Sequence, residues 1–155
     1  MATFKQLQRK SNIRELIKST FDADLALNGD WGYTKENATI IESLPEGMPL
    51  MQLEHMVTSI RAHLEMNITQ EKEHRYGGIN TNEKAREEYS HQEGLFNKVT
   101  YMITAIKEDL YTAFIKEYKE GYGKEDFDLN EHFKRREEAT LTREVIHYFE
   151  VSHIQ

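Results

Sequence analysis

Two long segments of the chain carry apolar residues in a heptad rhythm, in which successive apolar positions lie alternately three and four residues apart. In the first segment the rhythm runs through Leu50, Leu53, Val57, Ile60 and Leu64. Pro49 precedes it, at a position where a helix tolerates proline because the missing N–H would have no partner there. This spacing is typical of helices that pack along a seam, and it predicts a helix over residues 49–75.

The second segment keeps the same rhythm over a longer stretch. Its seam positions are Gln92, Phe96, Val99, Ile103, Ile106 and Leu110. The glycines of 121–123 end it, since glycine readily takes the left-handed conformation that closes a helix. Gly77 and Gly78 separate the two segments and predict a turn between helices. A phosphate loop is less favoured, because the chain lacks the G-x-x-x-x-G-K-S/T spacing. Together the segments predict a long antiparallel helical hairpin, about 49–75 paired with about 81–120.

The N-terminal part, residues 1–30, predicts a basic amphipathic helix. Ser11 is placed to cap a helix over 11–27. The apolar face of this helix would consist of Ile13, Leu16, Ile17 and Phe21. Asn28 and Gly29 then break the helix, and the β-forming residues that follow allow one short β element near 31–44.

The C-terminal segment, residues 126–155, carries two patterns at once. Residues 141–154 suit a helix, yet they are also rich in β-branched and aromatic residues. We favour the helix because the neighbouring chain is predicted to be helical. The expected fold class is therefore all-α, a helical bundle in one domain over 1–155, built on the hairpin of 49–120.

Composition and charge narrow the class of protein. The chain has 155 residues, no cysteine and a net charge of −7, and 30% of its residues are charged. The lack of cysteine excludes disulfides, thiolate zinc sites and cysteine nucleophiles. No apolar run approaches the length of a membrane span, so we expect a cytoplasmic, soluble protein. An acidic chain is also a poor general partner for nucleic acid.

Glu-x-x-His pairs are the most unusual motif. There are four of them: Glu71/His74, Glu88/His91, Glu144/His147 and Glu150/His153. Residues three apart share a helix face, and di-iron carboxylate bundles take such a pair from each of two helices. Across the predicted turn the first two pairs would approach each other. The favoured interpretation is exposed side chains on helices. The alternative is an Fe, Mn or Zn site with the ligands Glu71, His74, Glu88, His91, Glu144 and His147.

A second motif resembles a calcium-binding loop in its spacing alone. Asp126, Asp128, Asn130 and Glu137 fall at positions 1, 3, 5 and 12 of an EF-hand loop. Glu131 occupies the sixth position, where the sharp turn of that loop requires glycine. We therefore interpret Asp126 or Asp128 as the cap of a short helix.

Three groups of residues are candidate contact surfaces. Lys10, Arg14 and Lys18 form one basic ridge, which could dock on the acidic remainder of the protein, on an acidic partner or on nucleic acid. Trp31 and Tyr33 lie in a glycine-rich loop, where aromatic side chains mark contacts or fix the loop to the core. The apolar residues Phe114, Ile115 and Tyr118 extend past the shorter arm of the predicted hairpin.

The favoured function is that of a non-enzymatic interaction or assembly module. The uncovered stripe at 114–118 predicts a protein partner, with a homodimer as the first candidate, because monomers seldom expose such a patch. Catalytic motifs such as G-x-S-x-G and H-E-x-x-H do not occur. The alternatives are a helix-bundle metalloprotein and, less favoured, a regulator that binds nucleic acid through the N-terminal helix.

Overall fold

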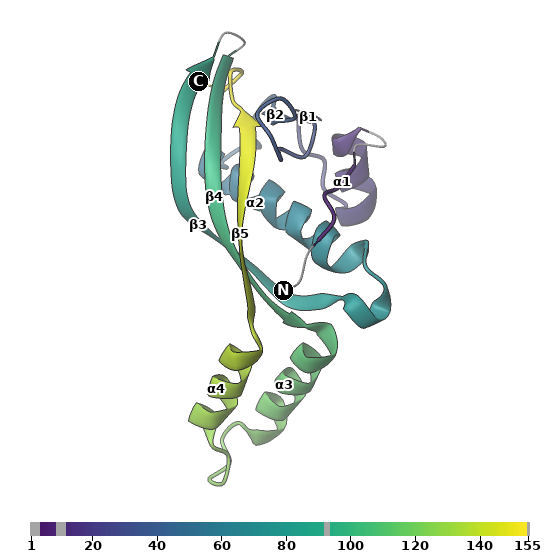
Figure 1. The fold of residues 1–155 in the computed structure, drawn as a ribbon, viewed down its shortest axis with the longest axis vertical. Coiled ribbons are helices and arrows are strands. Elements are labelled where there is room, and N and C mark those ends of the chain that lie inside the picture. The colour runs from purple at the N-terminus through teal and green to yellow at the C-terminus, as the bar shows by residue number, and fades with distance from the viewer. Residues whose placement is uncertain (1–3, 9–11, 92–93, 155) are drawn as a thin grey trace.

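The chain folds into a mixed α/β structure, in which one sheet is covered by helices on one face and carries a helical arm at one end (Figure 1). We describe a computed structural model, which places residues 4–8, 12–91 and 94–154. The strands are β1 (Leu27–Gly29), β2 (Thr39–Ile41), β3 (Tyr76–His91), β4 (Gly94–Lys107) and β5 (Leu141–Glu150). The helices are α1 (Ile13–Phe21), α2 (Leu50–His63), α3 (Glu108–Gly121) and α4 (Leu129–Ala139), with a π-helical turn at Leu64–Ile68 and a 3-10 turn at Lys72–His74.

The sheet has the strand order β1-β2-β5-β4-β3. β2 and β5 run parallel, and the other neighbouring strands are antiparallel. The long hairpin of β3 and β4 is paired along almost its whole length, from Tyr76 opposite Lys107 to His91 opposite Gly94. β3 therefore forms one edge of the sheet over 16 residues, while the C-terminal strand β5 lies in the middle.

The all-α prediction is wrong, and so is the coiled-coil-like hairpin of 49–75 and 81–120. Its second half is the hairpin of β3 and β4 followed by α3. The apolar residues of β4 satisfy two rhythms: Val99 and Ile103 fit the heptad, but Val99, Tyr101, Ile103 and Ala105 also recur at every second residue. These four are buried on one face of the strand. Because β-branched and aromatic side chains favour strands, the two-residue period prevails.

The first helix of the predicted hairpin is confirmed over α2 only. Its seam residues Leu53, Val57, Ile60 and Leu64 are buried as expected. They pack with Val99, Tyr101 and Phe149 of the sheet and with Ile13 and Ile17 of α1, rather than with a second long helix. Within the described residues, no helix combines the length and the apolar character needed to cross a membrane.

The glycine pair Gly77–Gly78 lies inside β3, so its predicted role as the end of a helix is wrong. The pairing of β3 with β4 shifts register between Gly77 and Asn80, and Gly78 has a φ of +56°. The ring of Tyr111, from α3, lies directly against it, so that a Cβ at this position would be 2.5 Å from Tyr111 Cε1. Glycine is required here by both the backbone conformation and the contact with α3.

We expect Gly78→Val to destabilise the protein by roughly 1–3 kcal/mol from backbone strain, and by more once Tyr111 is displaced. Gly47→Val is the matched control, since Gly47 also has a positive φ of +77° but no atom lies within 4 Å of its added Cβ. Chemical denaturation of both variants measures the difference. Equal losses would show that the Tyr111 contact contributes nothing.

The terminal segments differ from the helices predicted for them. α1 begins at Ile13, with the side chain of Asn12 as its cap, and the predicted cap Ser11 lies outside the described residues. β2 lies within the region 31–44, where one short β element was allowed. Residues 141–150 form β5 and not a helix, because their β-forming side chains pair with β4 over ten positions.

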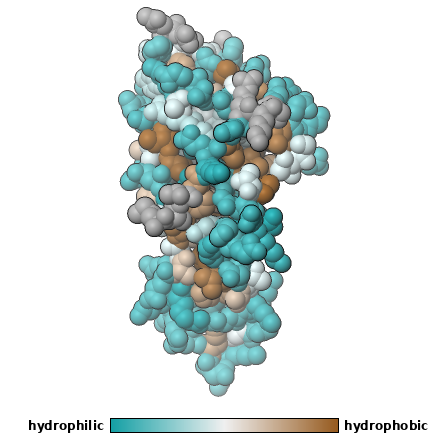
Figure 2. All heavy atoms as spheres, turned by 45° about the vertical axis from the view of Figure 1, so that its right-hand side comes forward, coloured by the Kyte–Doolittle hydropathy of each residue, from teal (hydrophilic) through white to brown (hydrophobic). Residues whose placement is uncertain are grey.

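A helical arm, residues 108–139, stands between β4 and β5. The two strands are in register up to Ala105 and Leu141, where a short turn could have joined them. Instead α3 and α4 project beyond the end of the sheet (Figure 1). The arm has a small core of its own, in which Phe114 and His132 are buried. Figure 2 shows apolar side chains gathered at the waist between the arm and the body.

Candidate functional site

A buried polar chain of hydrogen bonds crosses the core beside the β1–β2 connection. His147, on β5, is fully buried, with Nε2 2.9 Å from Thr39 Oγ1 and Nδ1 2.9 Å from Thr58 Oγ1. Thr39 in turn donates to the carbonyl oxygen of Asp30 at 2.6 Å. Because Thr39 donates its only proton to Asp30, it accepts from Nε2–H of a neutral imidazole. The hydroxyl of Thr58 lies between Nδ1 and the carbonyl oxygen of Glu54, which is 3.0 Å away, and has one proton to donate to either of them. Burial, assisted by the positive charge of Arg61, holds the pKa of His147 well below its usual value.

Arg61, on α2, fixes the next part of the same connection. Its side chain is buried, and its guanidinium donates to the carbonyl oxygens of Trp31 at 3.0 Å and Ile146 at 2.9 Å. Gly32 follows, with a φ of +77°, and its missing side chain leaves room for the ring of His147. The carbonyl oxygen of Gly32 also accepts from the backbone N–H of Tyr148 at 2.8 Å. The β1–β2 connection is thus hydrogen-bonded to α2 through Trp31 and to β5 through the next residue, Gly32.

Tyr33 closes this network on the side of α2. Its hydroxyl donates to the buried carboxylate of Glu65 at 2.5 Å, and Glu65 also accepts from Arg143 at 3.0 Å. The guanidinium of Arg61 lies 4.5 Å from the centre of the Tyr33 ring. Burial and the neighbouring Glu65 raise the pKa of the Tyr33 phenol well above its usual value. The buried charges of Glu65 and Arg61 are costly unless all of their hydrogen-bonding groups have partners. The network therefore holds this part of the fold in one conformation.

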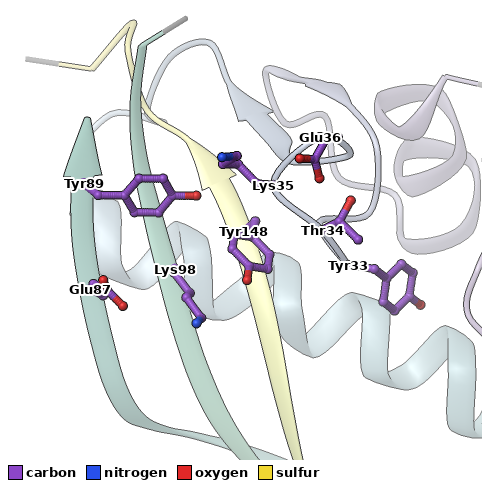
Figure 3. A pocket seen from close by; sticks show the side chains of 8 residues that line it. All are labelled: Tyr33, Thr34, Lys35, Glu36, Glu87, Tyr89, Lys98 and Tyr148. Carbon is purple, nitrogen blue, oxygen red and sulfur yellow. The ribbon is translucent and has the colours of Figure 1, made fainter. Parts of the chain in front are cut away.

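The connection forms one wall of a pocket on the opposite, helix-free face of the sheet, which we call the sheet pocket (Figure 3). Its volume is about 450 Å³, and it is lined by Tyr33, Thr34, Lys35, Glu36, Glu87, Tyr89, Lys98 and Tyr148. Glu87, Lys98 and Tyr148 form a row across β3, β4 and β5, because they are register partners. Figure 3 shows Lys35 reaching from the loop toward Tyr89.

A second hollow, the arm groove, lies where the arm leaves the sheet. Its volume is about 650 Å³, and it is lined by His63, Gly78, Ile79, Asn80, Thr104, Ala105, Ile106, Tyr111, Phe133, Arg136, Glu137 and Thr140. Phe133 is 45% exposed although it is a large apolar side chain. The guanidinium of Arg136 lies 5.4 Å from the centre of its ring. The groove therefore combines apolar side chains with the half-buried cation of Arg136 and the carboxylate of Glu137.

The arm is held together by an aromatic cluster around one buried histidine. The ring of His132 lies 5.3–5.8 Å from the rings of Phe114, Tyr118, Phe127 and Phe133. Its Nδ1 lies 3.0 Å from Glu117, which also pairs with Arg135. Hydrogen bonds from Arg135, and then from His132, lower the pKa of Glu117 to about 2. These contacts link α3 to α4 and fix the orientation of Phe133 beside the groove.

The residues of the predicted metal site do not come together. Glu71, His74, Glu88 and His91 are exposed, and the two pairs lie at opposite ends of β3, about 50 Å apart at 3.3 Å per residue. Glu144 is exposed and pairs with Lys84 at 2.7 Å, while His147 is buried. Glu-x-x-His places its two members on one face only in a helix, and β5 is a strand. Among the residues the structure describes, no group of three or more His, Asp or Glu is placed to hold a metal ion.

The structure places the predicted contact residues in different environments. Arg14 pairs with Asp24 at 2.7 Å, Lys18 is exposed, and Lys10 lies outside the described residues. Trp31 is buried and Tyr33 is half-buried, so these aromatics fix their loop to the core. The stripe expected to be uncovered is largely covered by α4, since Phe114 is buried against His132 while Ile115 and Tyr118 are half-buried.

The calcium-loop lookalike contains a helix cap. The side chain of Asp128 accepts a hydrogen bond from the backbone N–H of Glu131 at 3.1 Å and so begins α4. The interpretation that Asp126 or Asp128 caps a short helix is therefore confirmed, and the cap is Asp128.

Sequence reasoning missed the residues that line both hollows, apart from Tyr33. Lys98 and Tyr148 become neighbours only through the register of β4 and β5. Tyr111 and Phe133 line the same groove only because α3 and α4 pack against each other where the arm leaves the sheet. One signal was available: in β5 the residues Val145, His147 and Phe149 alternate with Glu144, Ile146 and Tyr148. Read as a strand, this pattern separates a buried face from an accessible one.

Comparison with known proteins adds no functional information. No protein-family model, curated protein or solved structure matches the chain.

Proposed function

We propose that the protein is a non-enzymatic interaction module, which binds another protein chain in the arm groove. The observation that carries this proposal is the exposure of Phe133 beside Arg136 in a groove whose lining mixes apolar and polar side chains. Aromatic residues and arginine are the side chains most enriched at the energetic centres of protein interfaces. Tyr111 and Ile106 line the same groove and extend its apolar surface.

The groove fits a partner segment that presents one apolar anchor next to a carboxylate. The anchor would pack between Phe133, Tyr111 and Ile106. The carboxylate would meet Arg136, which forms no ion pair within 4.0 Å among the described residues. Arginine suits this role, because its guanidinium binds a carboxylate through two parallel hydrogen bonds while it stacks on an aromatic ring.

The arm itself supports a role outside the stability of the sheet. It replaces a turn that could have joined Ala105 to Leu141 with 35 intervening residues. Four of the eight exposed large apolar side chains of the described chain belong to it, namely Leu110, Tyr122, Leu129 and Phe133. An addition that buries little and exposes much apolar surface is characteristic of a contact element.

Substitution of Phe133 by aspartate should abolish partner binding without unfolding the protein. The ring is 45% exposed and packs on His132 of the arm, so its loss weakens the arm but leaves the core of the sheet intact, whereas a charge in the groove opposes the apolar anchor. Leu129→Asp is the matched control, because Leu129 is on the same helix, is 39% exposed and does not line the groove.

The measurement is photocrosslinking in cells, with a photoreactive amino acid placed at position 133 or, separately, at position 129. We expect a defined protein adduct from position 133 that disappears when Arg136→Glu is added, and no such adduct from position 129. An adduct with a second copy of this chain would identify the partner as itself. Equal adducts from both positions, or adducts insensitive to Arg136→Glu, would contradict the proposal.

A further inference from the structure

The sheet pocket contains an unusual set of charged side chains that do not neutralise one another. Lys35, Glu36, Glu87 and Lys98 line it, and none forms an ion pair within 4.0 Å in the described part of the chain. Nearby on β3, by contrast, Glu83 pairs with Arg86 at 2.7 Å. With two cations and two anions, the pocket disfavours a ligand of a single charge and favours a ligand that carries both.

Tyr89 adds a polar group without a partner. Its hydroxyl oxygen is buried and makes no hydrogen bond within the described chain, although its ring is stacked on Phe96 at 5.5 Å. Burial, the neighbouring Tyr148 and the carboxylates of Glu36 and Glu87 raise its pKa, so the phenol keeps its proton and remains a donor. A buried donor that lacks an acceptor destabilises a protein unless a ligand supplies one.

The charged and polar groups of the pocket are placed so that the two opposite charges of a ligand would bind at different positions. Figure 3 shows Lys35 extending from the loop toward the side of the pocket on which Tyr89 lies. An oxygen atom between them would accept from both, as a carboxylate does. Glu87 lies two residues before Tyr89 on β3 and faces the same pocket, where its carboxylate would accept from an ammonium group.

The loop that supplies Lys35 and Glu36 is held rigidly. The buried contacts of Arg61 with Trp31, of Tyr33 with Glu65 and of His147 with Thr39 all act within a few residues of this loop. Binding sites gain affinity when their groups are fixed before the ligand arrives. The buried polar network therefore has a use beyond stability, which is to place two charged residues opposite the sheet.

We propose that the sheet pocket binds a small zwitterion of the free amino acid type, with its carboxylate between Lys35 and Tyr89 and its ammonium group toward Glu87. The pocket volume of about 450 Å³ lies at the small end of the range for ligand sites, which is roughly 300–1,000 Å³. This inference concerns a different surface from the arm groove and does not depend on the proposed protein partner.

The test is a titration of the ¹⁵N-labelled protein, followed by amide chemical shifts. The probes are the twenty common amino acids, β-alanine and γ-aminobutyrate, each added separately, with acetate and methylammonium as the two halves of a zwitterion. We expect at least one zwitterion to give saturable shifts centred on residues 33–36, 87–89, 98 and 148. Its affinity should exceed that of either half by about tenfold or more.

Two variants decide whether the proposed contacts are used. Tyr89→Phe removes a single hydroxyl and should weaken binding about tenfold to a hundredfold, because that hydroxyl bonds to a charged group. Lys35→Met should weaken it to a similar extent, while Lys119→Met, on an exposed position of the arm, should leave it unchanged. The proposal is overturned if no zwitterion gives saturable shifts, if acetate alone binds equally well, or if Tyr89→Phe binds like the wild type.

Discussion

Replacement of Arg61 by alanine will lower the free energy of unfolding by about 3–5 kcal/mol. The change leaves the buried carbonyl oxygen of Trp31 without this donor, and a loss of this kind costs roughly 1–3 kcal/mol. It also removes the donor of the carbonyl oxygen of Ile146, which is partly buried. It also removes the group that packs on the ring of Tyr33. A whole domain of this size is stable by only about 5–15 kcal/mol, so the effect will be large.

Urea denaturation measures the loss, and the fluorescence of Trp31 reports on its location. Trp31 is the single tryptophan of the chain and is 1% exposed, so an opened loop will shift its emission to longer wavelength. Arg14→Ala is the control, since Arg14 forms a solvent-exposed pair with Asp24, and such pairs contribute little to stability. A loss below about 1 kcal/mol for Arg61→Ala, with unchanged emission, would mean that the loop is held by other contacts.

Acid will destabilise the protein through His147. In the unfolded chain a histidine has a pKa near 6.5, whereas burial holds the pKa of His147 well below that value in the folded state. Below about pH 6.5 the unfolded chain therefore binds a proton that the folded chain does not. The stability is unaffected above this pH and falls as the pH decreases. The unfolding equilibrium constant should rise about tenfold per pH unit from this one group.

The His147→Gln variant isolates this contribution, because other groups titrate equally in both proteins. The variant will be less stable near neutral pH, but the difference from the wild type should shrink between about pH 7 and about pH 5. His74→Gln, at an exposed position outside the buried network, is the control and should leave the stability near neutral pH unchanged. If the difference between wild type and His147→Gln stays constant over this range, the buried imidazole does not behave as described.

The limits of the sequence are visible in the three strands that were expected to be helices. In β4 the apolar residues are so dense that helical and strand spacings both fit, and only the β-branched and aromatic content distinguishes them. In β3 even this signal is weak, because residues 82–88 are almost entirely polar. β3 forms through its pairing with β4, and no local pattern in residues 76–91 indicates this pairing.

The two hollows were still harder to predict, because each is assembled from distant parts of the chain. Lys35 and Lys98 share the sheet pocket through the register of the strands and the position of one loop. Nothing in the sequence pointed to Arg61, and His147 was considered only as a metal ligand or an exposed helix residue, yet both support that loop from inside the core. By contrast, α2 was predictable, since four seam residues and an initial proline agree on one helix.

The exposed edge of β3 has a consequence for the behaviour of the protein at high concentration. A strand of 16 residues at the edge of a sheet can pair with a strand of another chain, which is the first step toward fibrils. Here Glu83, Lys84, Arg86, Glu87 and Glu88 line the strand, and two register shifts interrupt it. The cost of burying these charges and the irregular backbone oppose the addition of another strand at this edge. The polar composition that made β3 hard to recognise in the sequence therefore also opposes aggregation of the folded chain.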